Sequence, residues 1–191
     1  MGRRKRLEKE MILEASAQLA EERGMEHFTL SELAQKLGVK PPSLYNHLNG
    51  MDQLSEELAY YAINQLEAVV QKAAVGRSGK AALYEIADAY RLFALQNPQL
   101  YSVILKLPQY EPPVIEEGRN MMQVLYRVLE PYHLNQDELR TFARAYRSAM
   151  HGFVSLEQAG FFLSEPERKT SYERLIGMIL QFLPQEEGAE K

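Results

Sequence analysis

The fold is decided by the segment Thr29-Leu-Ser-Glu32-Leu-Ala-Gln-Lys-Leu-Gly38-Val-Lys-Pro-Pro-Ser-Leu-Tyr-Asn-His-Leu48, which predicts two short helices joined by a tight turn. Thr29 followed three residues later by Glu32 is typical of a capping box, in which the hydroxyl accepts a free amide and the carboxylate reaches back. Gly38 can adopt the positive φ that a tight turn between helices requires. We therefore expect helices at about 30–37 and 41–48.

The two predicted helices would cross at a steep angle, with one apolar face turned inward. Ala34 is small enough to let the helices approach closely, and Val39 and Leu44 would fill the gap between them. This arrangement is a helix-turn-helix. The remaining side chains point outward and offer hydroxyls, an amide, an imidazole and a cation, which suit phosphates and base edges. The outward set is Lys40, Pro41, Pro42, Ser43, Tyr45, Asn46 and His47.

Each outward residue also has a plainer interpretation. Tyr45 could be a packing residue, but Leu44 already takes the inward position, so we favour a DNA-facing role for the ring. His47 could cap the end of its helix, and Lys40 and Ser43 could be an ordinary solvated helix start. The two prolines have no donors, so they either contact thymine methyl groups or only nucleate the helix.

The sequence outside this segment also predicts helices, because no stretch alternates with period two over the length of a strand. We expect an all-α protein, with a three-helix helix-turn-helix head at residues 1–50 and a C-terminal antiparallel helical bundle at 51–191 for effector binding and dimerisation. Helix breaks coincide with Gly and Pro. The other predicted helices are at about 7–23 (ending at Gly24), 52–75, 80–96, 99–107, 112–130, 135–163 and 166–183.

Composition narrows the functional classes. The net charge is −4, but residues 1–50 carry eight basic and seven acidic side chains, so the head is not acidic. The basic run Arg3–Arg6 could reach phosphates or could be a solvated tail. The absence of cysteine excludes disulfides and fits a cytoplasmic protein. No apolar run approaches the ~20 residues of a membrane span, and the basic N-terminus lacks the apolar stretch of a signal peptide.

An enzyme is not expected from this sequence. It has no Gly-rich phosphate loop, no serine nucleophile elbow and no pair of histidines at metal-ligand spacing. We therefore assign no catalytic residue, no metal and no cofactor. A helical scaffold without DNA binding would account for the long C-terminal helices, but it would leave the capped, glycine-turned head unexplained.

Residues 8–60 resemble the DNA-binding head of the tetracycline-repressor (TetR) family. The resemblance is carried by Phe28-Thr29, Leu33-Ala34, Leu37-Gly38-Val39, Leu44-Tyr45 and His47. It implies that Thr29, Tyr45 and His47 hold backbone phosphates, while residues 40–43 approach the bases. Two positions depart from the family. Met51 replaces a usual lysine, so one expected phosphate contact is missing, and Leu48 replaces a usual aromatic residue.

The segment from Arg147 to Glu157 resembles a C-terminal subfamily marked by Trp-His-Gly, with Met150 in place of the tryptophan. The resemblance implies that the last two long helices form a four-helix dimer interface and that the central helices enclose a small effector. The protein would then be a ligand-responsive repressor that binds double-stranded DNA, at a palindromic operator, as a homodimer. Gly152 and Gly160, eight residues apart, would share one face of the interface, together with the apolar run 175–183.

The expected effector cavity is mostly apolar and is bounded by the helices near 84–107 and 119–153. A hydrophobic or amphipathic small molecule would suit it, although an inward-facing Arg91, Arg119 or Arg147 would favour a carboxylate. For His151, we favour a buried, hydrogen-bonded structural role over a contact with the ligand. The candidate ligand-binding residues are Tyr101, Tyr126, Tyr146, Met150 and His151.

Overall fold

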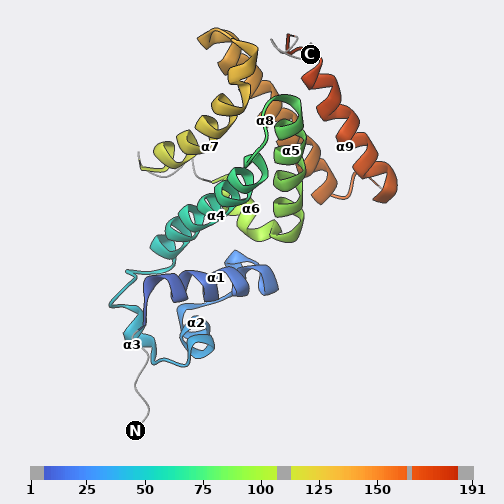
Figure 1. The fold of residues 1–191 in the computed structure, drawn as a ribbon. Helices are drawn as coiled ribbons and strands as arrows, with labels where there is room; N and C mark the ends of the chain where they lie inside the picture. Colours follow the sequence, from blue (N-terminus) through green and yellow to red (C-terminus); the bar gives the residue numbers. More distant parts are fainter. Residues whose placement is uncertain (1–6, 107–112, 163–164, 185–191) are drawn as a thin grey trace. The chain divides into compact units, whose positions relative to one another are not determined.

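The computed structural model describes residues 7–106, 113–162 and 165–184 (Figure 1). This part of the chain is helical and contains no strand, so the predicted all-α fold is confirmed. In chain order, the α-helices and the two 3₁₀ helices are α1 (Lys9–Arg23), η1 (Met25–His27), α2 (Leu30–Leu37), α3 (Pro41–Leu44), α4 (Met51–Ala74), α5 (Gly79–Gln96), α6 (Pro98–Ile104), α7 (Pro113–Leu129), η3 (Glu130–Tyr132), α8 (Gln136–Gln158) and α9 (Glu165–Leu180).

The C-terminal end of α8 differs from the prediction. The helix was expected to reach residue 163, but it ends at Gln158. Gly160 adopts a left-handed φ of 79°, and the N–H of Phe161 bonds back to the carbonyl of Leu156 at 3.1 Å, which completes a Schellman motif. Gly160 therefore lies beyond the helix, and the expectation that Gly152 and Gly160 share one helical face is wrong.

The chain divides into two compact units. The first comprises residues 1–64 and 97–115, and the second comprises residues 65–96 and 116–191. The first unit thus contains α6 as well as the three N-terminal helices, although α6 follows α5 directly in the sequence. This division describes compactness and does not test the functional boundary that the sequence predicts at residue 50.

The first unit has a core built from the apolar faces of its helices. α2 packs against both α1 and α3, and α1 also packs against α6. Ala34 has no exposed surface, as its small size and inward position predict. The large side chains that are almost completely buried include Ile12, Leu33, Leu44, Leu48, Leu54, Leu58, Ile63 and Tyr101.

In the second unit, α5 packs against α8 and α9, and hydrogen bonds from the two later helices reach carbonyl groups of α5. The hydroxyl of Tyr146 donates to the carbonyl of Leu83, and the hydroxyl of Tyr172 donates to that of Ala87 at 2.8 Å. Both tyrosines are buried, so each hydroxyl needs such a partner. A membrane-crossing helix is not found among the described residues.

Candidate nucleic-acid interface

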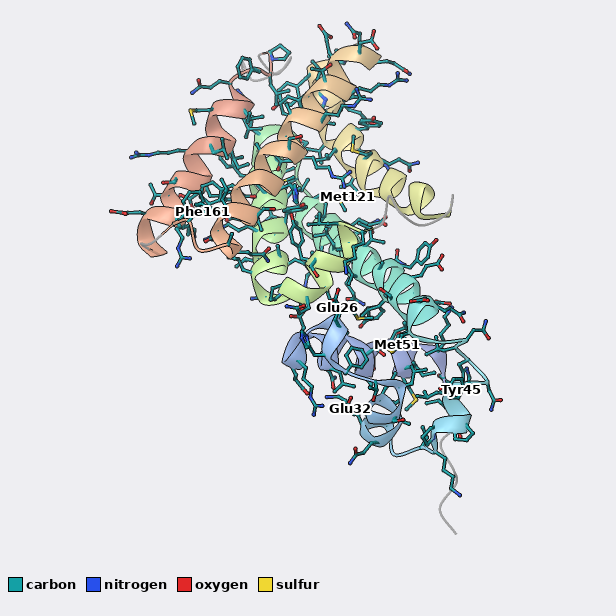
Figure 2. The ribbon with its side chains drawn as sticks, turned by 180° about the vertical axis from the view of Figure 1, so that it is seen from behind. Glu26, Glu32, Tyr45, Met51, Met121 and Phe161 are labelled. Atoms are coloured by element: carbon teal, nitrogen blue, oxygen red, sulfur yellow. The ribbon has the colours of Figure 1, made fainter. Side chains whose placement is uncertain are left out.

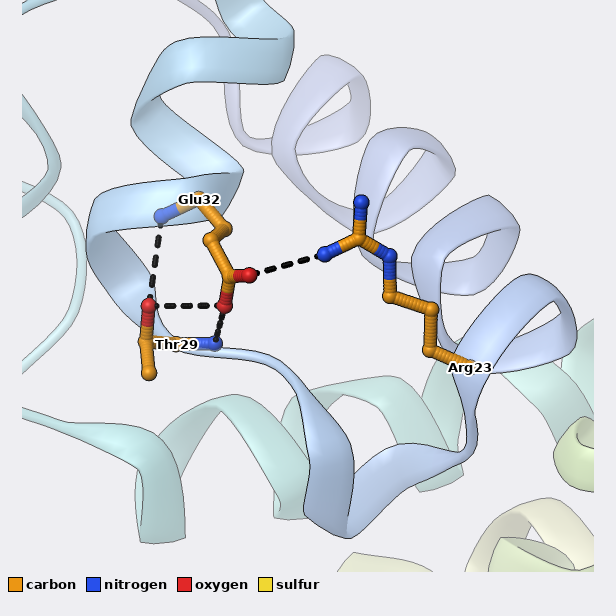
Figure 3. Close-up of polar contacts among 3 residues, drawn as sticks. All are labelled: Arg23, Thr29 and Glu32. Atoms are coloured by element: carbon orange, nitrogen blue, oxygen red, sulfur yellow. Dashed lines mark hydrogen bonds and ion pairs between the residues drawn. The ribbon is translucent and has the colours of Figure 1, made fainter.

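The predicted capping box at the start of α2 is confirmed (Figure 3). The hydroxyl oxygen of Thr29 accepts the N–H of Glu32 at 3.3 Å, and Glu32 Oε2 accepts the N–H of Thr29 at 2.8 Å. The Thr29 hydroxyl also donates to Oε2, at 2.9 Å. These hydrogen bonds lower the pKa of Glu32, with a smaller contribution from Arg23. Arg23 Nη1 bonds to Glu32 Oε1 at 2.7 Å, which joins the end of α1 to the start of α2.

The turn between α2 and α3 depends on Gly38. Its φ of 67° lies in the left-handed region, which residues with a Cβ rarely adopt. The N–H of Gly38 bonds to the carbonyl of Gln35 at 3.1 Å, and that of Val39 bonds to Ala34 at 3.0 Å. Two of the last carbonyls of α2, those of Ala34 and Gln35, thereby have partners, and α3 begins three residues after Gly38, at Pro41.

The third helix is shorter than predicted, because α3 ends at Leu44 and not near residue 48. The chain continues as a turn in which the N–H of His47 bonds to the carbonyl of Leu44, three residues back, at 2.8 Å. Leu44 and Leu48 point into the core, with 0% and 2% of their surfaces exposed. Tyr45 points away from this core and is 59% exposed (Figure 2).

The structure brings the predicted DNA-binding residues together in the first unit. All are exposed except Ser43, which is half-buried; the exposed ones are Thr29, Lys40, Pro41, Pro42, Tyr45, Asn46 and His47. They come from the start of α2, from α3 and from the turn that follows it. Because the Thr29 hydroxyl already donates to Glu32, a phosphate bond from this group would have to replace that contact.

Two contacts within the first unit had no recognised signal in the sequence. Gln53 Oε1 accepts the N–H of Asn49 at 2.7 Å and so secures the turn that leads into α4. Glu21, on α1, accepts two N–H groups at the start of α6. The bond between Asn49 and Gln53 joins residues four positions apart, a spacing that a local pattern can indicate. The partner of Glu21 lies about 78 residues away, and no local pattern indicates it. Met51, which replaces the usual lysine, is half-buried at the start of α4.

The predicted ligand-binding residues are divided between the two compact units. Tyr101 belongs to the first unit and is buried on α6. In the second unit, Tyr146 and Met150 are buried, whereas Tyr126 and His151 are half-buried. Burial raises the pKa of Tyr146 well above its usual value. Burial lowers the pKa of His151, and the charge of Arg147 adds to this effect.

The three arginines named with the cavity differ in their surroundings. Arg91 is buried, but Glu157 neutralises it through two bonds of 2.8 and 2.5 Å. Arg147 is exposed, and the side chain of Arg119 lies outside the described residues. Of the two arginines whose side chains are described, the buried one, Arg91, therefore already has an anionic partner within the protein.

Two surface grooves of similar size lie among the described residues of the second unit, in addition to a smaller one of about 370 Å³. One, of about 870 Å³, is lined by residues such as Tyr132, Phe142 and Leu183. The other, of about 790 Å³, lies between α5 and α9 beside Tyr84 and Asp88. The predicted ligand-binding residues line neither groove, so their role stays a prediction.

The fold and the head define a helix-turn-helix DNA-binding protein, and comparisons with known proteins give the family. Residues 12–58 match the family described as bacterial regulatory proteins, tetR family, and residues 83–179 match the tetracyclin repressor-like C-terminal domain. The chain belongs to the TetR family and is a DNA-binding transcriptional regulator. Proteins of this family are regulators and not enzymes.

Individual relatives agree with this assignment. The chain is 31% identical over 150 residues to the HTH-type transcriptional regulator YobS of Bacillus subtilis, covering 78% of each chain. It is 30% identical over 162 residues to the regulator Rv0681 of Mycobacterium tuberculosis, covering 84% of this chain and 74% of that one. A solved structure from Rhodococcus sp. RHA1, of a protein with unknown function, shares the fold with a TM-score of 0.78 at 19% identity, covering 92% of this chain and 95% of that one.

Proposed function

We propose that the protein is a ligand-responsive repressor that binds a palindromic operator as a homodimer. Residues 1–50 would bind DNA, and residues 51–191 would carry the effector site and the dimer interface. The observation that carries the proposal is the set of exposed polar residues on either side of α3, which are Lys40, Tyr45, Asn46 and His47, with Leu44 and Leu48 buried beneath them. Two such surfaces related by a two-fold axis would fit two half-sites of a palindrome.

The residues of this surface divide by chemistry into two roles. The hydroxyl of Tyr45 and the imidazole of His47 are donors suited to backbone phosphates, which set the position of the head on the duplex. Lys40 and Ser43 would lie nearer to the base edges, where the pattern of donors and acceptors differs between base pairs. Asn46 extends the same exposed surface and can pair with an adenine edge.

Tyr45→Ala tests the DNA-binding surface. The ring is 59% exposed and its neighbours Leu44 and Leu48 keep the core intact, so helical content should not change. Losing a hydrogen bond to a charged phosphate should weaken binding about tenfold or more, for specific and non-specific DNA alike.

Gel-shift titration, with an operator selected from random duplexes, would measure the affinity for DNA. Tyr84→Ala is the control, because it removes another exposed tyrosine from the other compact unit. Unchanged affinity in Tyr45→Ala would remove this residue from the site.

The dimer proposal is supported by a line of small side chains along α8, at alternating spacings of four and three residues. This spacing keeps the line on one helical face, as in coiled coils, and small side chains allow close approach of a second helix. A Cβ built on Gly152 meets no atom within 4 Å, so the protomer leaves this position open. The line, exposed or half-buried, consists of Thr141, Ala145, Ser148, Gly152, Ser155 and Ala159.

The next helix adds an apolar surface to the proposed interface. Met178 is 55% exposed, at the C-terminal part of α9, and Phe182, just after α9, is 83% exposed. Leu175 and Ile179 are half-buried and lie three or four residues from Met178 or Phe182, so they share one helical face with them. Burying large apolar side chains between two copies is favourable, by about 25 cal/mol for each Å² removed from water. These residues lie within the run 175–183 that the sequence predicts for the interface.

We propose a hydrophobic or amphipathic effector that binds in the second unit near Tyr146 and Met150. Aromatic and sulfur-containing side chains form suitable walls for such a molecule. The ion pair between Arg91 and Glu157 leaves the cation of Arg91 satisfied, which supports an uncharged ligand. The effector would release DNA only to the extent that it binds the DNA-free conformation more tightly than the DNA-bound one.

A further inference from the structure

The N-terminus of α6 is not capped by its own residues. Asn97, at the N-cap position, makes no side-chain capping hydrogen bond, and Pro98 has no N–H to satisfy. The N–H groups of Gln99 and Leu100 are then the free donors of the first turn, which every helix must satisfy with another partner. A helix of only seven residues has little stability of its own without such partners.

Both donors are bound by the carboxylate of Glu21, which lies on α1. Glu21 Oε1 accepts the N–H of Leu100 at 2.8 Å, and Oε2 accepts the N–H of Gln99 at 3.2 Å. The two bonds are charge-assisted, and the carboxylate also faces the positive end of the helix dipole. Glu21 is half-buried, so water competes less for these bonds than at an exposed site.

Apolar packing holds α6 to the same unit. Leu100, Tyr101 and Ile104 are buried, and α6 packs against α1. Just after α6, Lys106 Nζ lies 3.7 Å from Glu26 Oε1, but both side chains are exposed and such pairs contribute little. Among the described contacts, the two bonds of Glu21 are a strong polar connection between α6 and α1.

The position of α6 in the chain gives this connection a role. One residue, Asn97, separates the last residue of α5 from the first residue of α6, and the two compact units divide at this point. Any rearrangement that moves the end of α5 must pull on α6 through the backbone. Whether the head follows depends on how firmly α6 is attached to α1.

We propose that Glu21 is a positioning residue that makes α6 part of the DNA-binding body, so that the state of α6 and the occupancy of the head by DNA are coupled. The proposal rests on the proposed function, because it assumes that the head binds an operator. Coupling between two sites is reciprocal, so DNA bound at the head must in turn stabilise α6. This consequence can be measured without knowing the effector.

The test is amide hydrogen exchange, read by mass spectrometry on the full chain, with and without a selected operator duplex. In the unaltered protein, operator should slow exchange in residues 97–104 as well as in residues 29–48. In Glu21→Gln, which loses the charge and one acceptor, residues 97–104 should exchange roughly tenfold faster in the free protein. Operator should then protect residues 29–48 but no longer residues 97–104.

Glu22→Gln is the matched control, because it removes the same charge from the next position of α1. Glu22 pairs with Lys36 on α2 at 3.0 Å and does not contact α6 through any described bond, so operator should still protect residues 97–104 in this variant. Operator-induced protection of 97–104 that persists in Glu21→Gln would overturn the proposal. So would loss of protection at 29–48 in Glu21→Gln alone. If the unaltered protein shows no protection at 29–48, the proposed DNA-binding function itself fails.

Discussion

Glu32 shows how one side chain can serve two neighbouring helices. Its carboxylate caps α2 through Thr29 and also bonds to Arg23 at the end of α1. Both contacts are stronger with the ionised form, which is why the pKa of Glu32 is lowered, with the hydrogen bonds to Thr29 as the largest cause. At the residue scale, the charge of a single carboxylate therefore strengthens the entry into the helix-turn-helix.

We expect a pH-dependent stability contribution from Glu32. A carboxylate whose pKa is lower in the folded state stabilises the protein above its unfolded pKa, here 4.5, and loses this effect as the pH falls through the folded pKa. Glu32→Gln should therefore lower the thermal unfolding midpoint at pH 7, and its difference from the unaltered protein should shrink below about pH 4.5. Thermal melts followed by circular dichroism, at several pH values across this range, would measure the difference between the two unfolding midpoints. A difference that does not change with pH would contradict the assignment.

At the scale of helices, Arg91 and Glu157 fasten α5 to α8. Both side chains are buried, with 5% and 4% of their surfaces exposed, and the guanidinium also lies 5.8 Å from the centre of the Tyr172 ring on α9. Gln158, the last residue of α8, adds a bond to the carbonyl of Ala94 at 2.7 Å. Polar groups buried at helix contacts restrict how the helices can slide, because a shifted register would leave them unpaired.

Glu157→Gln should destabilise the protein strongly, because it replaces the buried carboxylate that pairs with Arg91 by a neutral amide. We expect a loss of about 3–5 kcal/mol in the free energy of unfolding, measured by urea titration. Glu173→Gln is the control: it breaks the exposed pair between Lys169 and Glu173, at 3.7 Å, and should cost about 1 kcal/mol or less. Equal effects of the two substitutions would show that burial does not matter here.

The proposed dimer face of α8 can be tested at Gly152. A leucine Cβ finds open space there in one protomer, and leucine favours a helix more than glycine does, so the protomer should not lose stability. Between two copies, the added side chain would hold the helices apart, and overpacking of about 1–3 kcal/mol should weaken dimerisation tenfold or so. Sedimentation over a range of protein concentrations would measure the dissociation constant of the dimer. Arg140→Leu is the control: it lies at an exposed position of α8, off the line of small residues, and should leave this dissociation constant unchanged.

At the scale of the whole molecule, regulation requires that an effector and an operator oppose each other. Because equilibrium coupling is reciprocal, any small molecule that weakens operator binding must itself bind less tightly when DNA is present. This reciprocal effect can be followed with a spin or fluorescence label. The chain contains no cysteine, so a single introduced cysteine would carry the only label on each subunit.

Three probes with the same ten-carbon chain and different head groups test the effector class. Decanol should raise the thermal unfolding midpoint and weaken operator binding. Decanoate and decylamine should have smaller effects on both quantities, because a buried charge without a partner is costly. Thermal melts and gel shifts in parallel would compare them. A response to decanoate but not to decanol would contradict an uncharged effector and would point to a cationic site.

Local signals in the sequence predicted the head well. The bounds of α2, the capping box of Thr29 and Glu32 and the left-handed turn at Gly38 all depend on residues within a few positions of one another, where hydrogen-bond geometry follows from residue type. The inward placement of Leu44 and the outward placement of Tyr45 follow from the same helical period. The candidate DNA-binding surface was accessible to sequence reasoning for this reason.

Contacts between distant segments were decided only by tertiary structure. Glu21 meets α6 across 79 residues, and Arg91 meets Glu157 across 66, and neither pairing leaves a periodic trace in the chain. Packing also determined which tyrosines are buried, because Tyr101 and Tyr146 resemble exposed Tyr84 in the sequence. A local pattern determines what a residue can do within its own turn of helix, but the partner that it meets depends on how the helices pack together, which a local pattern does not determine.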